Sequence, residues 1–292
     1  MSFFSIDAAQ GPVWMDGRLV PWDEATLHAL SHGLNNASCV FEGARIYAGK
    51  VFRLEKHARR LLKSAEIMGI TMHYTLARLC EATEELVRAR GLESGYVRPV
   101  VWKGHEDLGI AAPHAKTHVA IAALSLGDVV PAEVRAAGVR LKTSSWARPA
   151  PNTAPLGAKA SCHYALGSLA MREAQAAGFD DALLLDYRGF VAEATGTNIF
   201  IVKNGALLTP IADCALDGIT RQAVLELARR RNIDAAETRL YPKDVCEADE
   251  AFLTGTASEI LPIRAIDGVN FPAARPITDA LTDDYFSLVG KA

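Results

Sequence analysis

Residues 180–209 read DDALLLDYRGFVAEATGTNIFIVKNGALLT, and this stretch predicts a sheet of short strands. An apolar run, a polar turn at 186–189 and a second apolar pair are typical of a hairpin. Two further strands, at 198–203 and 206–209, are joined by an Asn-Gly pair, which is a strong signal for a tight turn. These strands follow one another too closely for repeated βαβ units, so we expect mostly antiparallel pairing in the second half of the chain.

Glu193 follows the second apolar pair of this hairpin, at the end of a strand. A side chain in that position can point into a cleft. A solvated carboxylate is the commoner case for a single glutamate. The hairpin by itself therefore leaves both interpretations open.

Lys159 is the only Lys, Arg, Asp or Glu in residues 150–164, which read APNTAPLGAKASCHY. An ammonium taken out of water loses solvation, which lowers its pKa and leaves more of the nucleophilic free amine. A lysine that bonds carbonyl compounds needs that amine. A loop lysine whose stem packs while its head reaches water explains this window equally well.

Two further segments could bind an anion. In LDGITRQAVLELARRR, Gly218, Ile219 and Thr220 lie where a helix begins, and helix N-termini attract phosphate. In LTGTASEILP, a strand runs into residues 255–257, whose N–H groups could form a second anion site. Each signal alone is weak, because Thr and Gly are ordinary capping and turn residues. With the isolated lysine and the strand-end acid, they predict a phosphorylated carbonyl cofactor.

Eight motifs in order along the chain resemble the branched-chain amino acid aminotransferases, of the fold type IV group of pyridoxal 5'-phosphate (PLP) enzymes. They are VPWDEATLHALSHGL, VFEGARIY, FRLEKHARRLLKSA, GYVRPVVWKG, RPAPNTAPLGAKASCHY, EATGTNIF, LDGITRQ and LTGTASEILPI. The resemblance covers nearly the whole chain. It implies an α+β fold of two domains, with a smaller α/β domain first and a larger, mostly antiparallel β-rich domain that holds PLP.

The resemblance implies a cofactor site. Lys159 resembles the lysine that bonds PLP covalently and later shuttles the substrate's proton. Glu193 resembles the acid that pairs with the pyridine nitrogen, and Tyr164 the tyrosine that binds the phenolic oxygen. The residues that would hold the phosphate are Arg60, Ile219, Thr220 and Thr256.

The resemblance also implies a substrate site. Tyr96 and Arg98 would receive substrate carboxylates, and we expect the Arg98 guanidinium to lie against solvent or an acid when no distal carboxylate is bound. The remaining substrate contacts would come from Phe41, Gly43, Arg45, Thr256 and Ala257. Asn36 stands where the family usually has an aromatic in the pocket wall, so this wall offers less apolar surface. Thr197 replaces the glutamate that usually precedes Asn198.

The resemblance implies a transaminase that moves the amino group of branched-chain L-amino acids (Leu, Ile, Val) to 2-oxoglutarate by a ping-pong mechanism. A D-amino acid or (R)-amine transaminase, or an aminodeoxychorismate lyase, would share the fold. A non-catalytic binding protein on this fold is the alternative from a different class. A homodimer or a higher homo-oligomer is implied by the resemblance alone.

Composition restricts the partners. The net charge of −3 gives no electrostatic footprint for nucleic acid, and no apolar run approaches the ~20 residues that span a bilayer.

The first ten residues lack the basic region of a secretory signal, and the five cysteines have no CxxC spacing, so we expect reduced thiols and a cytoplasmic protein. Two histidine pairs have i, i+4 spacing without the HExxH form, so we expect no metal site. These are His28 with His32 and His114 with His118.

A chain of 292 residues is long enough for about two domains of ~150 residues. Gly and Pro in GDVVPAE interrupt the pattern just after a strand, which indicates a link between domains. We therefore expect a small domain at 1–126, a linker at 127–138 and a larger domain at 139–292. The expected elements are a hairpin around Asp16 and Gly17, helices near 54–68, 76–90, 164–177 and 220–231, and strands near 96–102 and 118–124.

Overall fold

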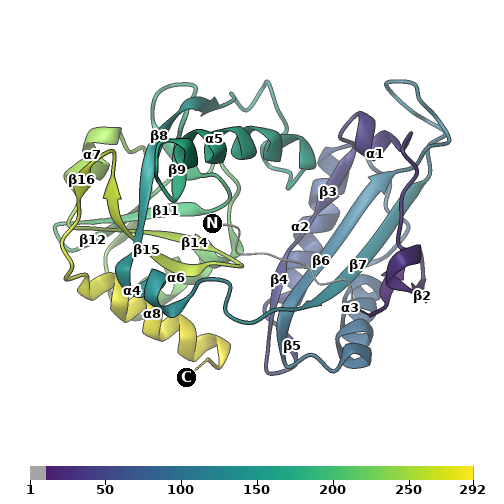
Figure 1. The fold of residues 1–292 in the computed structure, drawn as a ribbon, viewed down its shortest axis with the longest axis horizontal. Helices are drawn as coiled ribbons and strands as arrows, with labels where there is room; N and C mark the ends of the chain where they lie inside the picture. The colour runs from purple at the N-terminus through teal and green to yellow at the C-terminus, as the bar shows by residue number, and fades with distance from the viewer. Residues whose placement is uncertain (1–10, 292) are drawn as a thin grey trace. The chain divides into compact units, whose positions relative to one another are not determined.

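The computed structural model describes residues 11–291, which divide by their contacts into two compact units (Figure 1). The N-terminal unit comprises residues 11–128 and Gly157–His163. The C-terminal unit comprises Val129–Leu156 and residues 164–291. The chain therefore passes three times from one unit to the other. Residues 1–10 and 292, with which the first and last expected domains begin and end, lie outside the described residues.

The N-terminal unit contains one antiparallel sheet of order β2-β1-β7-β6-β4-β5, with β3 also paired to β6. Its strands are β1 (Val13–Met15), β2 (Arg18–Val20), β3 (Cys39–Phe41), β4 (Ala44–Tyr47), β5 (Lys50–Val51), β6 (Ser94–Lys103) and β7 (Thr117–Ser125). Its helices are η1 (Trp22–Glu24), α1 (His32–Asn35), α2 (Leu54–Ile67), α3 (Leu76–Arg90) and η2 (Ser161–His163). The expected hairpin, both helices and both strands are confirmed.

Helices α2 and α3 cover one face of this sheet. Leu61 of α2 and Leu86 of α3 are buried in one apolar cluster with Val97 and Ile121 of the sheet. The amphipathic pattern explains this arrangement, because apolar residues at helical spacing form one stripe that packs against the strands. Thr75 caps the start of α3 by accepting a hydrogen bond from a backbone N–H of its first turn. The two helices thus shield this face of the sheet from water.

The C-terminal unit contains a second sheet of order β10-β9-β8-β15-β14-β11-β12-β13, with β16 paired to β15. Its strands are β8 (Val139–Arg148), β9 (Asp181–Asp186), β10 (Val191–Ala194), β11 (Asn198–Lys203), β12 (Ala206–Pro210), β13 (Ala235–Thr238), β14 (Glu250–Gly255), β15 (Glu259–Ile266) and β16 (Val269–Asn270). Its helices are α4 (Ala132–Ala137), α5 (Tyr164–Ala176), α6 (Ile219–Arg230), α7 (Pro242–Cys246) and α8 (Pro276–Val289). In this unit α5 packs on β8 and β9, whereas α6 and α8 pack together and contact β14.

Most pairs in this sheet are antiparallel, as expected, and the hairpins β9–β10 and β11–β12 are confirmed. Three pairs are parallel: β8 with β9, β8 with β15, and β12 with β13. The first of these arises because α5 is a crossover that returns the chain in the same direction. The expected helices near 164–177 and 220–231 are present as α5 and α6. Helix α4 lies within the stretch 127–138 that the sequence suggests as a linker.

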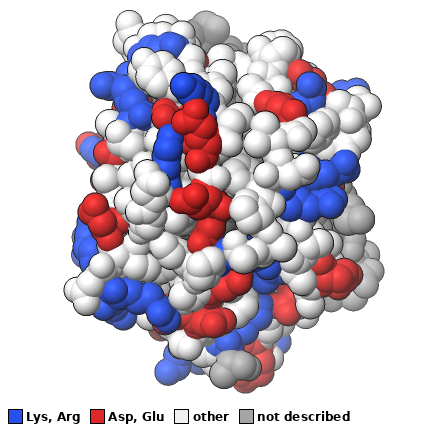
Figure 2. All heavy atoms as spheres, turned by 90° about the vertical axis from the view of Figure 1, so that its left-hand side faces the viewer, with Lys and Arg blue, Asp and Glu red and all other residues white. Residues whose placement is uncertain are grey.

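The surface in the view of Figure 2 is neither uniformly acidic nor uniformly basic, because acidic and basic side chains lie next to one another among uncharged residues. This mixture agrees with the small net charge of −3. None of the helices within residues 11–291 combines the length and apolarity that crossing a lipid bilayer requires.

Candidate active site

Lys159 is held in the N-terminal unit by its backbone. Its N–H donates to Oγ of Ser64 on α2 at 2.9 Å, and its carbonyl accepts from the N–H of Phe41 at 3.1 Å. Ala158 and Ala160 on either side belong to the apolar core. The side chain is half-buried, and its Nζ lies 5.1 Å from the centre of the Phe41 ring. The flanking alanines thus anchor the segment, and the amine lies over an aromatic ring.

Arg98 lies between two aromatic rings of the same unit. Its guanidinium carbon is 4.8 Å from the centre of the Phe41 ring and 5.2 Å from that of Tyr96. Its Nη2 also donates to Oη of Tyr96 at 3.3 Å. The residue is half-buried, so the guanidinium lies over two ring faces and is still partly exposed to solvent. The positive charge is attracted to the electron-rich ring faces.

Gly43 allows Tyr96 to occupy its position. A Cβ at Gly43 would lie 1.7 Å from Oη of Tyr96 and 2.4 Å from its Cζ. No side chain fits there, so glycine is required for the close approach of ring and backbone. Phe41, Gly43, Tyr96 and Arg98 are thereby brought together with Lys159.

Two other residues, Arg45 and Asn36, were also expected at the substrate site, and Arg45 pairs directly with Tyr96 across β4 and β6. Arg45 is buried on β4, where its Nη1 donates to the carbonyl of Gly127 at 2.9 Å. Its Nε has no hydrogen-bond partner among the described residues. Asn36 is exposed at the C-terminal end of α1, and its N–H donates to the carbonyl of His32 at 2.9 Å.

Arg60, expected to bind the cofactor phosphate, forms an ion pair with Glu42. Nε and Nη2 of Arg60 donate to the two carboxylate oxygens at 2.5 and 3.0 Å. Arg60 is on α2, four residues before Ser64, so it shares the helix face that contacts Lys159. Glu42 occurs in the motif VFEGARIY, but its role was missed by the sequence analysis, because nothing in the pattern indicates the partner of that carboxylate.

Glu193 is buried in the C-terminal unit, so the interpretation as a solvated carboxylate is wrong. It lies in β10 opposite Leu184 of β9, beside an irregularity in the strand register, and is 8% exposed. Its Oε1 lies 3.2 Å from Nε of Arg148, the last residue of β8. The same Nε donates to the carbonyl of Cys214 at 3.1 Å. Arg148 was missed by the sequence analysis, although it is the first residue of the motif RPAPNT.

Helix α6 begins at Ile219, with Gly218 as its N-cap residue, as expected. No side chain caps this end within the described residues, and an α-helix leaves its first N–H groups without intrahelical acceptors. Asn198 of β11 holds the preceding loop by donating to the carbonyl of Leu216 at 2.8 Å. A Cβ at Gly218 would lie 2.1 Å from Oδ1 of Asn198, so glycine is required for this contact. The end of α6, with Ile219 and Thr220 buried in its first turn, is thus fixed against the sheet.

A group of buried hydroxyls surrounds the turn between β14 and β15. Oγ1 of Thr197, Oγ1 of Thr254 and Oγ of Ser258 have no hydrogen-bond partner among the described residues. A Cβ at Gly255 would meet Thr197 at 2.8 Å and Ser258 at 2.9 Å, so these two side chains flank the turn. Thr254 pairs with Asn198, which places the turn next to the loop that leads into α6. Thr256 and Ala257, two of the expected site residues, are the next residues of this turn.

Unsatisfied buried hydroxyls are rare in folded proteins. Together with the uncapped start of α6, they form a region that suits the acceptor oxygens of a phosphate. Tyr164 is half-buried as the first residue of α5. One turn later, Gly167 packs so closely on the carbonyl of Thr195 that a Cβ would lie 2.7 Å from it. The start of α5 therefore adjoins the segment after Glu193, and the residues present fit PLP.

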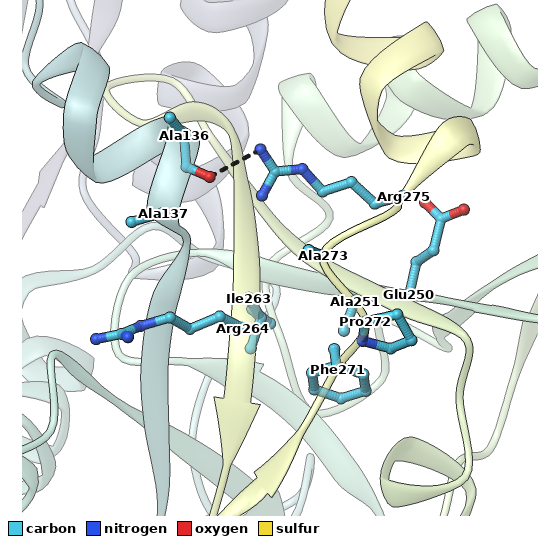
Figure 3. A pocket seen from close by; sticks show the side chains of 10 residues that line it. All are labelled: Ala136, Ala137, Glu250, Ala251, Ile263, Arg264, Phe271, Pro272, Ala273 and Arg275. Carbon is cyan, nitrogen blue, oxygen red and sulfur yellow. Dashed lines mark hydrogen bonds between the residues drawn. The ribbon is translucent and has the colours of Figure 1, made fainter.

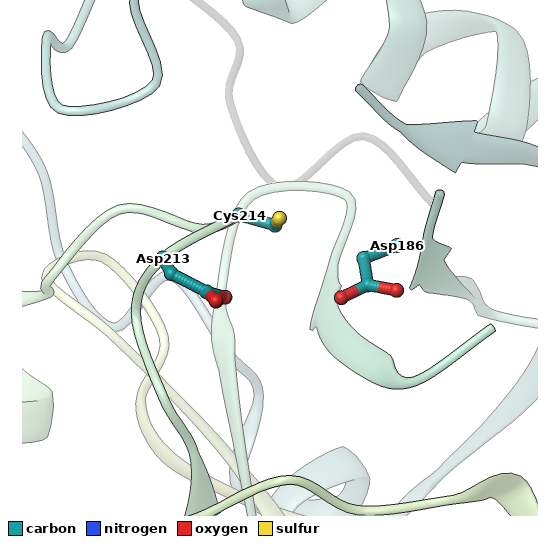
Figure 4. A group of neighbouring side chains, drawn as sticks. All are labelled: Asp186, Asp213 and Cys214. Carbon is teal, nitrogen blue, oxygen red and sulfur yellow. The ribbon is translucent and has the colours of Figure 1, made fainter. Parts of the chain in front are cut away.

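A separate acidic cluster consists of Asp186, Asp213 and Cys214 (Figure 4). Arg188 offsets part of its negative charge, because Nη2 donates to Asp186 at 2.6 Å and to Asp213 at 2.8 Å. Burial and the two carboxylates raise the pKa of the Cys214 thiol to about 11. The cluster is thus an ion-pair network around an arginine.

A cavity of about 150 Å3 lies elsewhere in the C-terminal unit (Figure 3). Arg275 crosses one side of it and donates to the carbonyl of Ala136 at 3.1 Å. Its other lining residues are Ala137, Glu250, Ala251, Ile263, Arg264, Phe271, Pro272 and Ala273. None of the residues expected at the active site lines this cavity.

The fold and these residues can be compared with known proteins. Residues 39–266 match the sequence pattern of the family described as amino-transferase class IV. The chain belongs to this family. Members of the class IV aminotransferase family depend on PLP.

This class IV aminotransferase is similar over nearly its whole length to proteins that are named branched-chain amino acid aminotransferases. The branched-chain-amino-acid aminotransferase of Pseudomonas aeruginosa is 42% identical over 285 residues, which cover 96% of this chain and 93% of that protein. The crystal structure of the Escherichia coli branched-chain amino acid aminotransferase matches with a TM-score of 0.93 and 36% identity, over 97% of this chain and 96% of that one.

A third comparison involves a protein solved with its cofactor. The branched-chain amino acid aminotransferase from Thermobaculum terrenum, in its PLP form, matches with a TM-score of 0.89 and 33% identity, over 98% of this chain and 96% of that one. The expected family and the α+β fold class are confirmed by these matches.

Proposed function

We propose that this protein is a PLP-dependent transaminase that moves the amino group of branched-chain L-amino acids to 2-oxoglutarate. The observation that carries the proposal is the placement of Lys159, which is half-buried with its backbone fixed and its Nζ 5.1 Å from the Phe41 ring centre, beside Tyr96 and Arg98. The similarity to named branched-chain aminotransferases over more than nine-tenths of the chain supports the substrate class.

The cofactor would be held at four points by this chain. Lys159 would bond the carbonyl carbon, Glu193 would face the pyridine nitrogen, and Tyr164 would donate to the phenolic oxygen. The phosphate would be bound by Arg60, Ile219, Thr220 and Thr256. The uncapped start of α6 and the unsatisfied hydroxyls around Gly255 support this assignment, because both offer hydrogen bonds that the described residues do not use.

Bound PLP would supply a carbonyl that bonds amines and a ring that accepts an electron pair. Lys159 Nζ would take the proton from the substrate's alpha carbon and later return a proton. The Glu193 carboxylate would keep a proton on the ring nitrogen, and the Arg148 guanidinium, 3.2 Å away, is its cationic partner. Since one keto acid leaves before the next arrives, the kinetics would be ping-pong.

Substrate selection would use the Phe41, Tyr96 and Arg98 side chains. The rings would pack on an aliphatic side chain, and Arg98 would pair with the distal carboxylate of glutamate or 2-oxoglutarate. Gly43, Arg45, Thr256 and Ala257 would complete the contacts, and Asn36 would contribute a polar group to the wall.

The proposal also covers assembly, domains and location. A homodimer or higher homo-oligomer is proposed by resemblance to the family. The domain boundaries at 1–126, 127–138 and 139–292 are proposed from the Gly and Pro in GDVVPAE, although Gly157–His163 group with the first unit by their contacts. No disulfide joins the cysteines within the described residues, which is what a reducing compartment would give, so a cytoplasmic location is part of the proposal.

A panel of amino donors tests this function. The holoenzyme is mixed with L-leucine, L-glutamate, D-alanine and an (R)-amine, and the loss of the bound cofactor's absorbance band is followed in a single turnover. L-leucine and L-glutamate are expected to bleach the band. Bleaching by D-alanine or the amine, with L-leucine inert, would leave a PLP transaminase of a different specificity. A purified protein that stays colourless with added PLP would support a non-catalytic binding protein.

A further inference from the structure

Glu42 is a buried carboxylate that joins a sheet to helix α2. It lies between β3 and β4, and its side chain is 0% exposed. Oε2 lies 2.7 Å from Nδ1 of His57 and accepts from the N–H of Gly43 at 3.2 Å. Both oxygens also accept from Arg60. Every donor around the carboxylate belongs to the N-terminal unit, so the network forms within one body.

The carboxylate of Glu42 is ionised at neutral pH. Burial, the largest influence, acts to raise its pKa, but the charge of Arg60 and the hydrogen bonds from His57 and Arg60 together hold the pKa well below its usual range. Burial also lowers the pKa of His57, so its ring is neutral and donates through Nδ1 in this network. Arg60 is therefore the cation that balances Glu42.

Solvent has little room to replace this carboxylate. A cavity of about 10 Å3 adjoins Glu42 and His57, and its other lining residues are almost entirely apolar, including Leu54, Leu61 and Val97. A buried water needs at least that volume together with two to four polar partners. The cavity is at the lower limit for a single water, so solvent would restore little of the interaction lost with the Glu42 charge.

The ion pair fixes the plane of the Arg60 guanidinium. Both contacts use the edge formed by Nε and Nη2, so Nη1 lies on the side away from Glu42. A bidentate pair of this kind gives orientation as well as energy. A free arginine side chain samples many rotamers, whereas this one is 15% exposed and tied to a buried anchor.

We propose that Glu42 is a positioning residue, which orients Arg60 so that its outer edge binds the phosphate of the cofactor. This inference rests on the proposed function, which assigns Arg60 to that phosphate. Glu42 itself would not touch the cofactor. Its effect would therefore depend on the presence of both Arg60 and the phosphate group.

A comparison of two ligands tests the inference. The full chain, freed of cofactor, is titrated with PLP and with pyridoxal, which lacks the phosphate, while protein fluorescence is followed. Glu42→Gln should weaken PLP binding about ten- to a hundredfold and change pyridoxal binding by less than about twofold. Arg60→Ala should also weaken PLP selectively. Addition of Glu42→Gln to Arg60→Ala should cause no further selective loss, because the oriented group is gone.

Glu55→Gln is the matched control. Glu55 is on the same helix and pairs with Arg59, but both side chains are 65% exposed. This variant should bind both ligands as the parent does. Glu42→Asp keeps the charge on a shorter side chain, and its selective loss should be smaller than that of Glu42→Gln. Glu42→Asp also serves as the test if Glu42→Gln does not fold.

The outcomes separate the two proposals. Equal weakening of PLP and pyridoxal by the Glu42 variants would mean that Glu42 supports only the fold, and would overturn the inference. An unchanged preference for PLP would overturn it as well. A second selective loss in the Arg60→Ala background would show that Glu42 acts without Arg60. If the parent itself binds PLP no better than pyridoxal, the phosphate site of the proposed function fails, and this inference fails with it.

Discussion

Nε of Arg148 lies 3.2 Å from Oε1 of Glu193, and both residues are almost completely buried, at 6% and 8% exposure. The two residues are 45 positions apart, on β8 and β10, which are both neighbours of β9 in the sheet. The pair gives Glu193 a buried cationic partner within the same sheet. A residue that faces a ring nitrogen from a buried position would need such a partner.

Replacement of Glu193 by Gln should slow proton abstraction from the substrate. A neutral amide cannot hold the ring nitrogen protonated, and a lost charge-assisted bond of ~1.5 to 3 kcal/mol corresponds to roughly a ten- to hundredfold lower rate. Both half-reactions should be measured by stopped-flow absorbance. Glu247→Gln, the same change at a carboxylate with 49% exposure, should leave the rates unchanged. Parent rates in Glu193→Gln would remove Glu193 from the chemistry.

Replacement of Lys159 by Ala should abolish multiple turnover, because the variant would lack the amine that we propose moves the proton. PLP should still bind through Arg60 and the start of α6, without a covalent link that borohydride can fix. Mass spectrometry after borohydride treatment measures the link, and a coupled assay measures turnover. Lys50→Ala, at an exposed lysine of the same unit, is the control. Appreciable turnover by Lys159→Ala would contradict the assigned role.

Replacement of Arg98 by Ala should discriminate between substrates. Glutamate and 2-oxoglutarate should bind ~1.5 to 3 kcal/mol more weakly, whereas leucine, which has no distal charge, should change less. Tyr96→Phe keeps the ring beside Arg98 and removes only the hydroxyl that accepts from Nη2 at 3.3 Å, so its effect should be smaller. Single-turnover titrations with each substrate measure this. An equal loss for leucine and glutamate would make Arg98 a structural residue.

Replacement of Gly43 by Ala should displace the Tyr96 ring, because the added Cβ would lie 1.7 Å from Oη. Overpacking of this kind costs about 1–3 kcal/mol, which we expect to appear as weaker substrate binding and a lower melting temperature. Gly127→Ala is a suitable control, since nothing lies within 4 Å of the added atom. A Gly43→Ala variant with parent KM values would show that the position of Tyr96 is unimportant for substrate.

The pH dependence of stability should contain a contribution from Glu42. Its pKa in the folded protein lies below the ordinary value of 4.5, so the folded state favours the ionised form. This stabilisation is complete above about pH 4.5 and is lost as the pH falls through the folded pKa. Glu42→Gln should therefore lower the free energy of unfolding at pH 7, by at most about 3–5 kcal/mol. The difference from the parent should shrink on acidification below pH 4.5.

Urea unfolding at pH 7 and pH 3.5 measures this difference. Glu55→Gln, in an ion pair with 65% exposure on both sides, should show little effect at either pH. A gap between parent and Glu42→Gln that widens in acid would contradict the assignment of an ionised Glu42.

Helices and turns that are specified by residues close together in the chain were predictable from the sequence. Helices α2 and α3 have an amphipathic period and clear ends, and the Asn-Gly pair fixes the turn between β11 and β12. The start of α6 at Ile219 followed from Gly218 and the apolar period. These features depend on residues that are close in sequence, so a pattern of a few residues contains the information.

Pairings between distant segments were not predictable in the same way. The parallel contacts of β8 with β9 and β15 join segments that are far apart in the sequence, and strand composition does not specify them. Helix α8 was missed, although Pro276 in its first turn is a typical start signal. The partners of Glu42 and Glu193 were missed for the same reason, since Arg60 and Arg148 are 18 and 45 residues away.

The return of residues 157–163 to the N-terminal unit restricts the order in which the protein can fold during synthesis. Ala158 and Ala160 belong to the apolar cluster of that unit, and Ala160 pairs with Val40 of β3. The ribosome must therefore release Val129–Leu156, a segment of the other unit, before the first core can close. A nascent chain arrested after residue 128 would expose the part of its sheet that these alanines cover. Lys159, on which turnover would depend, lies in this late segment. More than half of the chain must therefore be synthesised before the first unit can be completed.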